Sequence, residues 1–312
     1  MEEVERRALG ALLGLFVGDA FGAQTEFITE ERLVQAHPNS LLEMDERERC
    51  IGVSGMITDD SEMAIMLAKS MIKQGTVDSE DIRRGYMRWL DALPSDIGTT
   101  ILTALREGVL NPDSQANGAL MRVAPIGVAG ATLSEEAIIA FSDSDCAITH
   151  IHPVCRDANR LWALAIAKVV REGLSAPQVY EYLLSIAPQV TEEEILLDTI
   201  REARSKAPAS CDGRGQGWVI LALHLSLHTL LHASGIEEGI IQITMRGGDA
   251  DTNAAIYGAL AGAVFGADAI PIRWIEALRP TRCLEDLLGA EAADLAALAH
   301  TLSTGLVRLG TI

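Results

Sequence analysis

Apolar residues recur at helical spacing along most of this chain, and three stretches carry the strongest signal. Residues 4–18 form an apolar run, residues 217–232 are apolar almost throughout, and residues 252–265 are rich in Ala and Gly. A helix that is apolar on all sides must be buried in the protein. We therefore predict a buried central helix over 217–232, packed among other helices.

Four glycines recur every four residues near the amino end. Gly10, Gly14, Gly18 and Gly22 would share one face if the first helix extended that far. Residues four apart are neighbours on a helix surface, and small residues there let a second helix approach closely. This pattern predicts a tight contact between the first helix and another one.

Polar residues ahead of apolar runs predict where further helices begin. Ser, Thr and Asp accept hydrogen bonds from the first free N–H groups of a helix, and Glu or Gln three residues later completes a capping box. Residues 240–244 are β-branched and predict one short strand. The predicted helix starts are Asp59 with Glu62, Asp78, Ser134, Ser175 with Gln178, and Thr191 with Glu194.

Loops are predicted where Gly, Pro, Asn, Asp and Ser gather, but none has the composition of an interdomain linker. No internal repeat and no low-complexity tract divides the chain. We therefore expect one domain over residues 1–312. The predicted loops are 37–57, 91–98, 110–119, 142–155 and 205–216.

Composition narrows the fold and the partners. The 312 residues are 48% hydrophobic but only 4% aromatic, which favours a core of closely packed helices built from Ala, Leu, Ile and Val. The net charge of −19 argues against a nucleic-acid duplex or an anionic membrane as partner. A diphosphate ligand would then need metal ions, backbone N–H groups or helix N-termini.

The cysteines and the amino end indicate a cytoplasmic protein. Five cysteines without a Cys-x-x-Cys pair suggest neither a disulfide framework nor a zinc site. The apolar run of residues 8–17 is too short to span a bilayer, and we identify no targeting segment.

Two acidic clusters are the candidate metal-binding residues. Thr58-Asp59-Asp60-Ser61 stands at one predicted helix start, and Asp249-Ala250-Asp251-Thr252 follows Gly247-Gly248 at another. Either cluster alone has an ordinary explanation, because Thr and Asp are common helix caps. Carboxylates this close repel each other in a folded interior unless a cation neutralises them. Oxygen ligands suit Mg²⁺ or Mn²⁺, and four Asp with two Thr suffice for two ions roughly 3.5–4 Å apart.

Two other patterns are discounted. His224, His228 and His232 recur every four residues, but three ligands from one straight helix do not converge easily on a tetrahedral zinc ion. Gly213-x-Gly215-x-Gly217 resembles half of a dinucleotide-binding fingerprint without the strand that should precede it, although the loop could still cover the adenine side of a ligand.

Six motif blocks follow one another along most of the chain. They are Gly14 to Gly22 with Glu26-Phe27, Thr58 to Ser61, Asp96 to Thr100, Asn117 to Gly127, Thr149-His150, and Gly247 to Thr252 with the helix that runs on to Ala263. In these blocks and their order the chain resembles the ADP-ribosylglycohydrolases.

The resemblance implies an all-α fold, a single compact multi-helix orthogonal bundle, and a binuclear metal centre. It implies two Mg²⁺ or Mn²⁺ ions held by Thr58, Asp59, Asp60, Asp249, Asp251 and Thr252. Three positions depart from the family pattern: Ser61 replaces Thr, Ala250 replaces Thr or Ser, and Ala116 replaces Gly. The change at Ala250 removes a hydroxyl beside the ligands, which could alter metal affinity.

Further roles follow from the same resemblance. Glu26, Asp60, Asp96 and Asp251 are the candidate catalytic residues, although Glu26 could be a solvated loop residue and Asp96 a helix cap. Asn117, Gly118, Met121 and His150 are the candidate ligand contacts. Their ordinary alternatives are a core position for Met121 and a structural hydrogen bond for His150. Arg122 could face a diphosphate or pair with a structural carboxylate.

The implied function is hydrolysis that removes ADP-ribose from a modified protein or small molecule, with ADP-ribosyl-arginine as the expected substrate. A carboxylate at Asp96 suits a planar guanidinium. The alternatives are ADP-ribosyl-serine, O-acyl-ADP-ribose, or a relative that binds ADP-ribose without catalysis.

Overall fold

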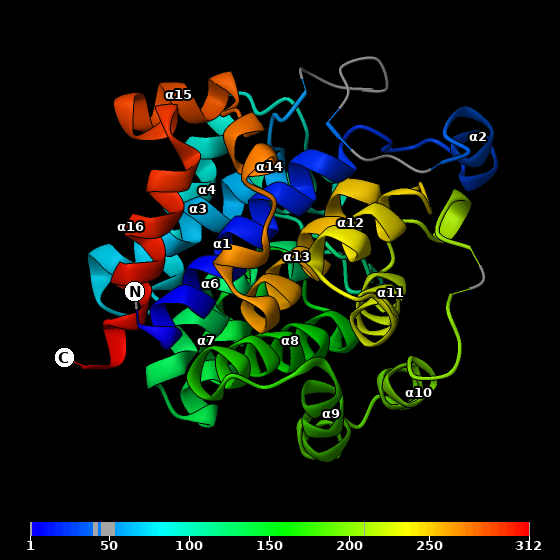
Figure 1. Cartoon of the computed structure of the whole chain (residues 1–312). Helices are drawn as coiled ribbons and strands as arrows, with labels where there is room; N and C mark the ends of the chain where they lie inside the picture. Colours follow the sequence, from blue (N-terminus) through cyan, green and yellow to red (C-terminus); the bar gives the residue numbers. More distant parts are fainter. Residues whose placement is uncertain (1, 40–42, 45–53, 209, 312) are drawn as a thin grey trace.

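The computed structural model describes residues 2–39, 43–44, 54–208 and 210–311, and helices are the regular secondary structure of this part of the chain (Figure 1). No strand occurs among these residues, so the prediction of an all-α fold is confirmed. Within the same ranges, no helix is both long enough and apolar enough to cross a membrane.

The helix bounds show short connections between most elements. The α-helices are α1 Glu3–Gly22, α2 Glu30–Ala36, α3 Asp59–Gln74, α4 Ser79–Asp91, α5 Thr99–Leu102, α6 Ala124–Ala129, α7 Glu135–Cys146, α8 Pro153–Glu172, α9 Ala176–Val190, α10 Glu194–Glu202, α11 Val219–His232, α12 Ile236–Thr244, α13 Ala250–Phe265, α14 Ile272–Ala277, α15 Arg282–Leu288 and α16 Leu295–Val307. A π-helical turn, Thr103–Glu107, extends α5, and short 3₁₀ turns lie at Leu120–Arg122, Gly130–Thr132, Gly213–Gly215, Ala267–Ala269, Gly289–Ala293 and Leu309–Thr311.

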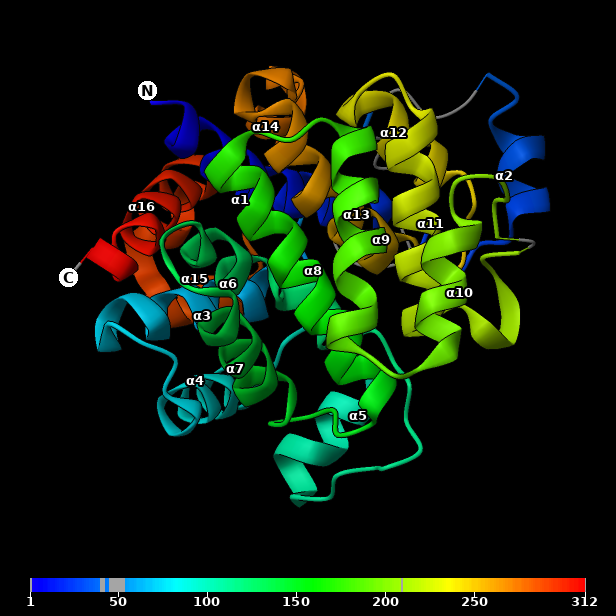
Figure 2. The same cartoon turned by 90° about the horizontal axis from the view of Figure 1, so that it is seen from below.

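Helices α1 and α13 form the centre of the fold, with α3, α8, α11, α12 and α16 around them (Figures 1 and 2). The predicted glycine face of α1 lies directly against α13. A methyl group added at Gly14 would overlap the carbonyl oxygen of Gly258, and one added at Gly10 would overlap that of Gly262. The predicted close contact between two helices is therefore confirmed, and it brings their backbones directly together.

The two central helices run in opposite directions. Gly10 of α1 faces Gly262 near the end of α13, whereas Gly22 faces Ala250 at its start. The carboxyl end of α1 and the loop that follows it therefore lie beside the amino end of α13. This arrangement positions the candidate site.

The predicted helices are present, but two of the predicted capping boxes do not form. Asp78 and Ser134 accept backbone N–H groups of α4 and α7, and Gln178 accepts the N–H of Ser175 ahead of α9. The capping box at Thr191 does not form, because the Thr191 hydroxyl accepts the N–H of Glu193 and α10 begins only at Glu194.

The second capping box that does not form is that of Asp59 with Glu62, although α3 does begin at Asp59. Helix α3 is preceded by Thr58, so Asp59 already lies inside it. The Glu62 carboxylate points away from the helix start and accepts hydrogen bonds from Trp89 Nε1, at 2.7 Å, and from the Thr281 hydroxyl. Hydrogen bonds to Trp89 and Thr281, which are distant in sequence, therefore take the place of the predicted capping bond of Glu62.

The predicted strand over residues 240–244 is also wrong, because these residues belong to α12. Ile240 and Ile243 are buried three positions apart, and Gly239 packs against the ring of Tyr257 in α13. Helical burial of one apolar face thus outweighs the β-branched composition.

Several predicted loops are confirmed, including 91–98 between α4 and α5. Loop 142–155 is shorter than predicted, because α7 continues to Cys146 and α8 begins at Pro153. Loop 37–57 falls partly outside the described residues, as does Cys50. The other four cysteines are buried and free.

We predict that Gly14→Ala lowers the free energy of unfolding by about 1–3 kcal/mol, because the new methyl group forces α1 away from the Gly258 backbone. Urea unfolding followed by circular dichroism measures the change. Gly85→Ala is the matched control, since Gly85 lies inside α4 with no atom within 4 Å of an added Cβ. This control should stabilise the protein by about 0.5–1 kcal/mol. Equal stability of the Gly14→Ala variant and the wild type would contradict the tight contact.

Candidate functional site

The two acidic clusters meet at the starts of α3 and α13. The Thr252 hydroxyl donates to Asp60 Oδ2 at 3.4 Å, and the Thr58 hydroxyl oxygen lies 3.1 Å from the same oxygen. Asp60 and Asp251 are both almost fully buried. Side chains separated by about 190 residues of sequence therefore share one interior location.

Asp19 in α1 fixes the start of α3. Its carboxylate accepts the backbone N–H of Thr58 at 3.0 Å and that of Ser61 at 3.2 Å, together with both hydroxyl groups. An N-terminal helix turn has free N–H groups, and a carboxylate is favourable there. We assigned no role to Asp19 from sequence, although a lone acid in an apolar, glycine-rich helix was a signal for one.

The start of α13 is positioned by two glycines. Gly247 and Gly248 have φ values of 64° and 70°, in the left-handed region that favours glycine. A methyl group on Gly248 would overlap the carbonyl oxygen of Cys211. Residues with a side chain rarely adopt this backbone conformation, so the glycine pair sets how the chain enters α13.

The same turn holds the loop that carries Glu26. Phe27 N–H donates to the Gly248 carbonyl at 2.7 Å, and Gly248 N–H donates to the Ile28 carbonyl at 3.0 Å. Phe27 itself has a φ of 61°, which is unusual for a residue with a side chain. Glu26 is thereby held beside α13.

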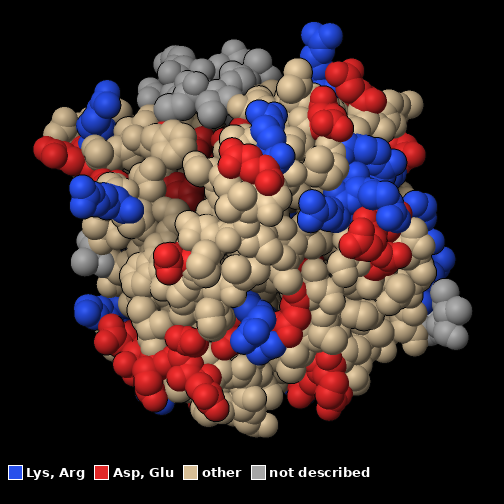
Figure 3. Space-filling model, turned by 180° about the vertical axis from the view of Figure 1, so that it is seen from behind, with Lys and Arg blue, Asp and Glu red and all other residues tan. Residues whose placement is uncertain are grey.

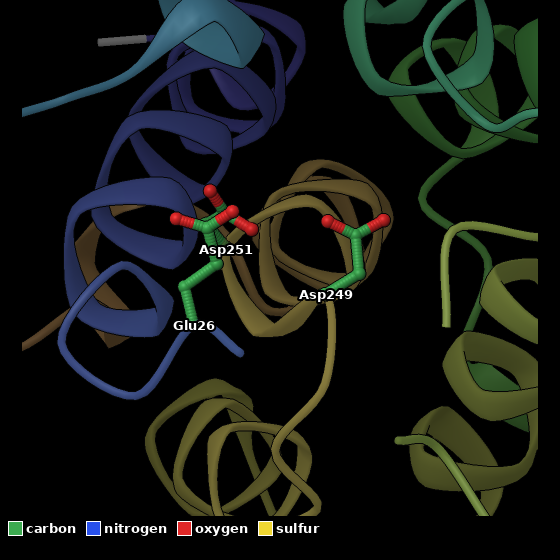
Figure 4. Close-up of side chains that lie close together, drawn as sticks. All are labelled: Glu26, Asp249 and Asp251. Carbon is green, nitrogen blue, oxygen red and sulfur yellow. The ribbon is translucent and has the colours of Figure 1, made fainter. Parts of the chain in front are cut away.

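Three carboxylates converge as a result. Glu26 comes from the loop after α1, and Asp249 and Asp251 come from the start of α13 (Figure 4). One oxygen from each lies within 4.8 Å of the others. Asn117 donates to Asp249 Oδ2 at 2.6 Å and so orients that side chain. Three convergent oxygens at this spacing could hold a metal ion.

Burial and mutual repulsion govern the ionisation of this cluster. Burial, followed by the charges of Asp96 and Asp19, raises the pKa of Asp59 well above its usual range. Burial and neighbouring carboxylates likewise raise the pKa of Asp60 and of Asp251. Burial also raises the pKa of Glu62 to about 7. A divalent cation would reverse these shifts by stabilising the charged forms.

Asp60 lies where a positive charge would stabilise the buried carboxylates. Its Oδ1 atom is buried and has no hydrogen-bond partner among the described residues. A buried acceptor left unpaired is costly. In the part of the chain that the structure describes, no Lys or Arg lines the adjoining pocket.

That pocket has a volume of about 400 Å³, within the range of small-molecule sites. Figure 3 shows a hollow with acidic atoms deep inside it on one face of the molecule. Every predicted site residue except Thr58 and Asp60 lines the pocket, and those two lie directly behind it. The predicted residues at its wall are Glu26, Asp59, Asp96, Asn117, Gly118, Met121, His150, Asp249, Asp251 and Thr252.

His150 presents a neutral ring to this pocket. Burial, assisted by the charge of Arg122, lowers the pKa of His150 to about 3. Arg122 donates to the Thr149 hydroxyl oxygen at 2.9 Å, and that hydroxyl lies 2.8 Å from His150 Nδ1. The Thr149 proton has no other acceptor among the described residues, so it is donated to Nδ1. The ring proton then resides on Nε2, which has no protein partner in the same part of the chain.

Arg122 is a structural residue. Its guanidinium is completely buried and forms an ion pair with Asp145 at 3.0 Å. It also donates to the Gly118 carbonyl at 2.9 Å, so it supports the loop that carries Asn117. Of the two roles left open from sequence, the geometry supports pairing with a carboxylate.

The histidine triplet of α11 lies along one side of that helix, as its spacing predicts. Each ring contacts a backbone carbonyl, and the His228 and His232 rings stack. The glycine-rich segment near residue 215 forms a 3₁₀ turn, and Gln216 and Gly217 reach the pocket wall.

Comparison with known proteins places this site in a family. The ADP-ribosylglycohydrolase family model matches residues 1–304. The chain belongs to the ADP-ribosylglycohydrolase family. The prediction from the six sequence blocks is therefore confirmed.

Similar proteins support the same conclusion. The ADP-ribosyl-[dinitrogen reductase] glycohydrolase of Rhodospirillum rubrum is 31% identical over 289 residues, covering 88% of this chain and 91% of that protein. The ADP-ribosylarginine hydrolase Tri1 of Serratia proteamaculans (strain 568) is 27% identical over 288 residues, covering 87% of this chain and 75% of that protein.

A solved structure shares the fold. An ADP-ribosylglycohydrolase-related protein complex superposes with a TM-score of 0.79 at 28% identity, covering 99% of this chain and 100% of that one. The family and these relatives indicate a hydrolase of ADP-ribosyl linkages.

We predict that the metal-free protein loses stability as pH rises from 5 to 7.5. A carboxyl group whose pKa is raised by folding binds its proton more tightly in the folded state. Stability is therefore lost above the ordinary carboxyl range, for Glu62 between 4.5 and about 7. The free energy of unfolding, measured with chelator present, should fall by on the order of 1–3 kcal/mol.

Asp60→Asn tests the source of this dependence. The amide keeps an acceptor for Thr58 and Thr252 but carries no charge, so the metal-free variant should be more stable at pH 7.5 and less sensitive to pH. Asp198→Asn, at an exposed position in α10, should leave the pH profile unchanged. A chelated wild type that becomes more stable toward pH 7.5 would show that the carboxylates are neutralised within the protein.

Proposed function

We propose that the chain removes ADP-ribose from ADP-ribosyl-arginine in a reaction that depends on two Mg²⁺ or Mn²⁺ ions. The observation that carries this proposal is the buried group of carboxylates from two helix starts, at a pocket that no described Lys or Arg lines. Membership of the ADP-ribosylglycohydrolase family is the reason for proposing an ADP-ribosyl linkage as the bond that is cleaved.

The residues present fit a pair of hard cations. Asp60 Oδ1 is buried without a partner among the described residues, and the other ligand atoms are carboxylate and hydroxyl oxygens of the type that Mg²⁺ and Mn²⁺ prefer. When bound, the ions would supply Lewis acidity and lower the pKa of water. The residues proposed to hold them are Thr58, Asp59, Asp60, Asp249, Asp251 and Thr252.

The protein groups orient the reactants and move protons. Hydrolysis breaks the bond between ribose C1″ and the acceptor nitrogen, water supplies the hydroxyl at C1″, and the nitrogen leaves with a proton. We assign that proton transfer to Glu26 or Asp96, since both line the pocket. Asp60 and Asp251 would set the charge around the attacking water. Asn117, Gly118, Met121 and His150 would contact the ADP-ribose.

Asp96 supports arginine as the acceptor. Its half-buried side chain lies at the pocket wall, where burial raises the pKa of its carboxyl group. A carboxylate pairs strongly with a planar guanidinium through two parallel hydrogen bonds. A relative named as an ADP-ribosylarginine hydrolase covers most of this chain. A seryl or acyl acceptor offers no charge for Asp96 to pair with.

We expect Asp249→Asn and Asp251→Asn each to lower the rate of ADP-ribose release from ADP-ribosyl-arginine by about 100-fold or more, because each removes a proposed metal ligand. Chromatographic detection of free ADP-ribose, with Mn²⁺ or Mg²⁺ added after chelation, measures the rate. Asp198→Asn is the matched control at an exposed site. Wild-type rates in folded Asp249→Asn and Asp251→Asn variants would refute the metal-centred mechanism.

Asp96→Asn should weaken hydrolysis of the arginine-linked substrate by roughly 10-fold or more, while serine-linked and acyl-linked substrates, if cleaved at all, change much less. The rates on the three substrates, measured with one protein preparation, give the ratio of arginine-linked hydrolysis to serine-linked or acyl-linked hydrolysis. A uniform loss on all three would assign Asp96 to proton transfer instead. Preferred cleavage of the serine or acyl substrate by the wild type would show that the acceptor assignment is wrong.

A further inference from the structure

A second cavity of about 630 Å³ lies away from the acidic site, between the later part of α3 and helices α4, α15 and α16. The proposed metal ligands occupy the first turn of α3, whereas this cavity is lined by residues from Met66 onward in the same helix. A helix rises about 1.5 Å per residue, so roughly 10 Å of helix separates the two. The second cavity is therefore a separate site.

The floor of the cavity is apolar. Met66 and Ile72 of α3, Leu287 of α15, and Leu298 and Leu302 of α16 all line it. Apolar walls in a concavity of this size are typical of sites that take a small ligand with an apolar body.

The rim of the cavity carries charged side chains of both signs. Lys69, Lys73 and Arg88 line it together with Asp81, Asp286 and Glu291, and Arg84 is exposed beside it on α4. Figure 3 shows Lys and Arg side chains gathered on one side of the back of the molecule. Because the cations and the acids that line the rim are equal in number, its attraction for an anion depends on which cations are left unpaired.

Some of this positive charge is uncommitted. Lys69 pairs with Glu291, and both Lys73 and Arg84 pair with Asp81. Arg88 forms no ion pair with any other described residue. Its exposed guanidinium can receive an anionic group at the mouth of the cavity.

Gly85 keeps the cavity open. It lies in the interior of α4, where glycine costs about 1 kcal/mol relative to alanine. No positive φ explains it, and an added Cβ would meet no atom within 4 Å. The glycines of α1, by contrast, are in direct contact with α13. The missing side chain at Gly85 instead enlarges the space beside Arg88.

We propose that this cavity binds a small amphipathic anion, with its apolar body on the leucine floor and its anionic group at Arg88. The apolar part of the ligand could be an aliphatic chain or an aromatic ring system, because either can pack against the apolar floor of the cavity. The proposal is independent of the activity at the acidic site.

Isothermal titration calorimetry with two probes, decanoate and 1-naphthyl phosphate, tests the proposal on the full chain. We expect saturable binding of at least one probe to a single site, and the probe that binds identifies the body. Decyltrimethylammonium, which carries the opposite charge on a similar tail, should bind at least about tenfold more weakly. Failure of both probes to saturate, or equal binding of the cation, would overturn the proposal.

Three variants locate the binding. Gly85→Leu fills the cavity from α4 and should weaken the bound probe by about tenfold or more. Arg88→Gln should weaken it several-fold, and Arg83→Gln, a matched change on α4 outside the cavity, should leave the affinity unchanged. Circular dichroism checks that each variant is folded. Unchanged affinity in both Gly85→Leu and Arg88→Gln would place the probe elsewhere and refute the assignment.

Discussion

Repulsion among buried carboxylates is the constraint on which the functional site depends. Asp60 and Asp251 are held in the interior by the starts of two helices, where charge is poorly screened and, among the described residues, no basic side chain lines the adjoining pocket. Asp19 fixes the start of α3, Asn117 orients Asp249, and two threonine hydroxyls lie within 3.4 Å of Asp60 Oδ2. Such an arrangement is unfavourable by itself and becomes favourable once cations are bound.

The fold and the acidic clusters could be predicted from sequence because their signals are local or periodic. The glycine spacing of α1 predicted its contact with α13, and the ordered motif blocks predicted the family. The capping box predicted at Asp59 was wrong because Glu62 found partners in Trp89 and Thr281, which are distant in sequence. The strand at 240–244 was wrong for a similar reason, since packing against α13 overrides local preference.

Within the candidate site, residue types were predictable but their connections were not. Spacing alone could not show that Asp19 would fix the start of α3, because the two segments are about forty residues apart. The neutral state of His150 likewise depends on its burial and on the nearby charge of Arg122, which lower its pKa only in the folded chain. The ligand-binding roles of Asn117, Gly118, Met121 and His150 remain predictions, and only their position at the pocket wall is established.

The glycine contact between α1 and α13 has a consequence for how this protein can evolve. One inserted residue within α1 would rotate everything beyond it by about 100° and advance it by about 1.5 Å. Side chains would then replace glycines against the α13 backbone, and both Asp19 and the Glu26 loop would be displaced together. Length changes in this lineage should therefore accumulate in surface loops, while the central helix keeps its exact residue count.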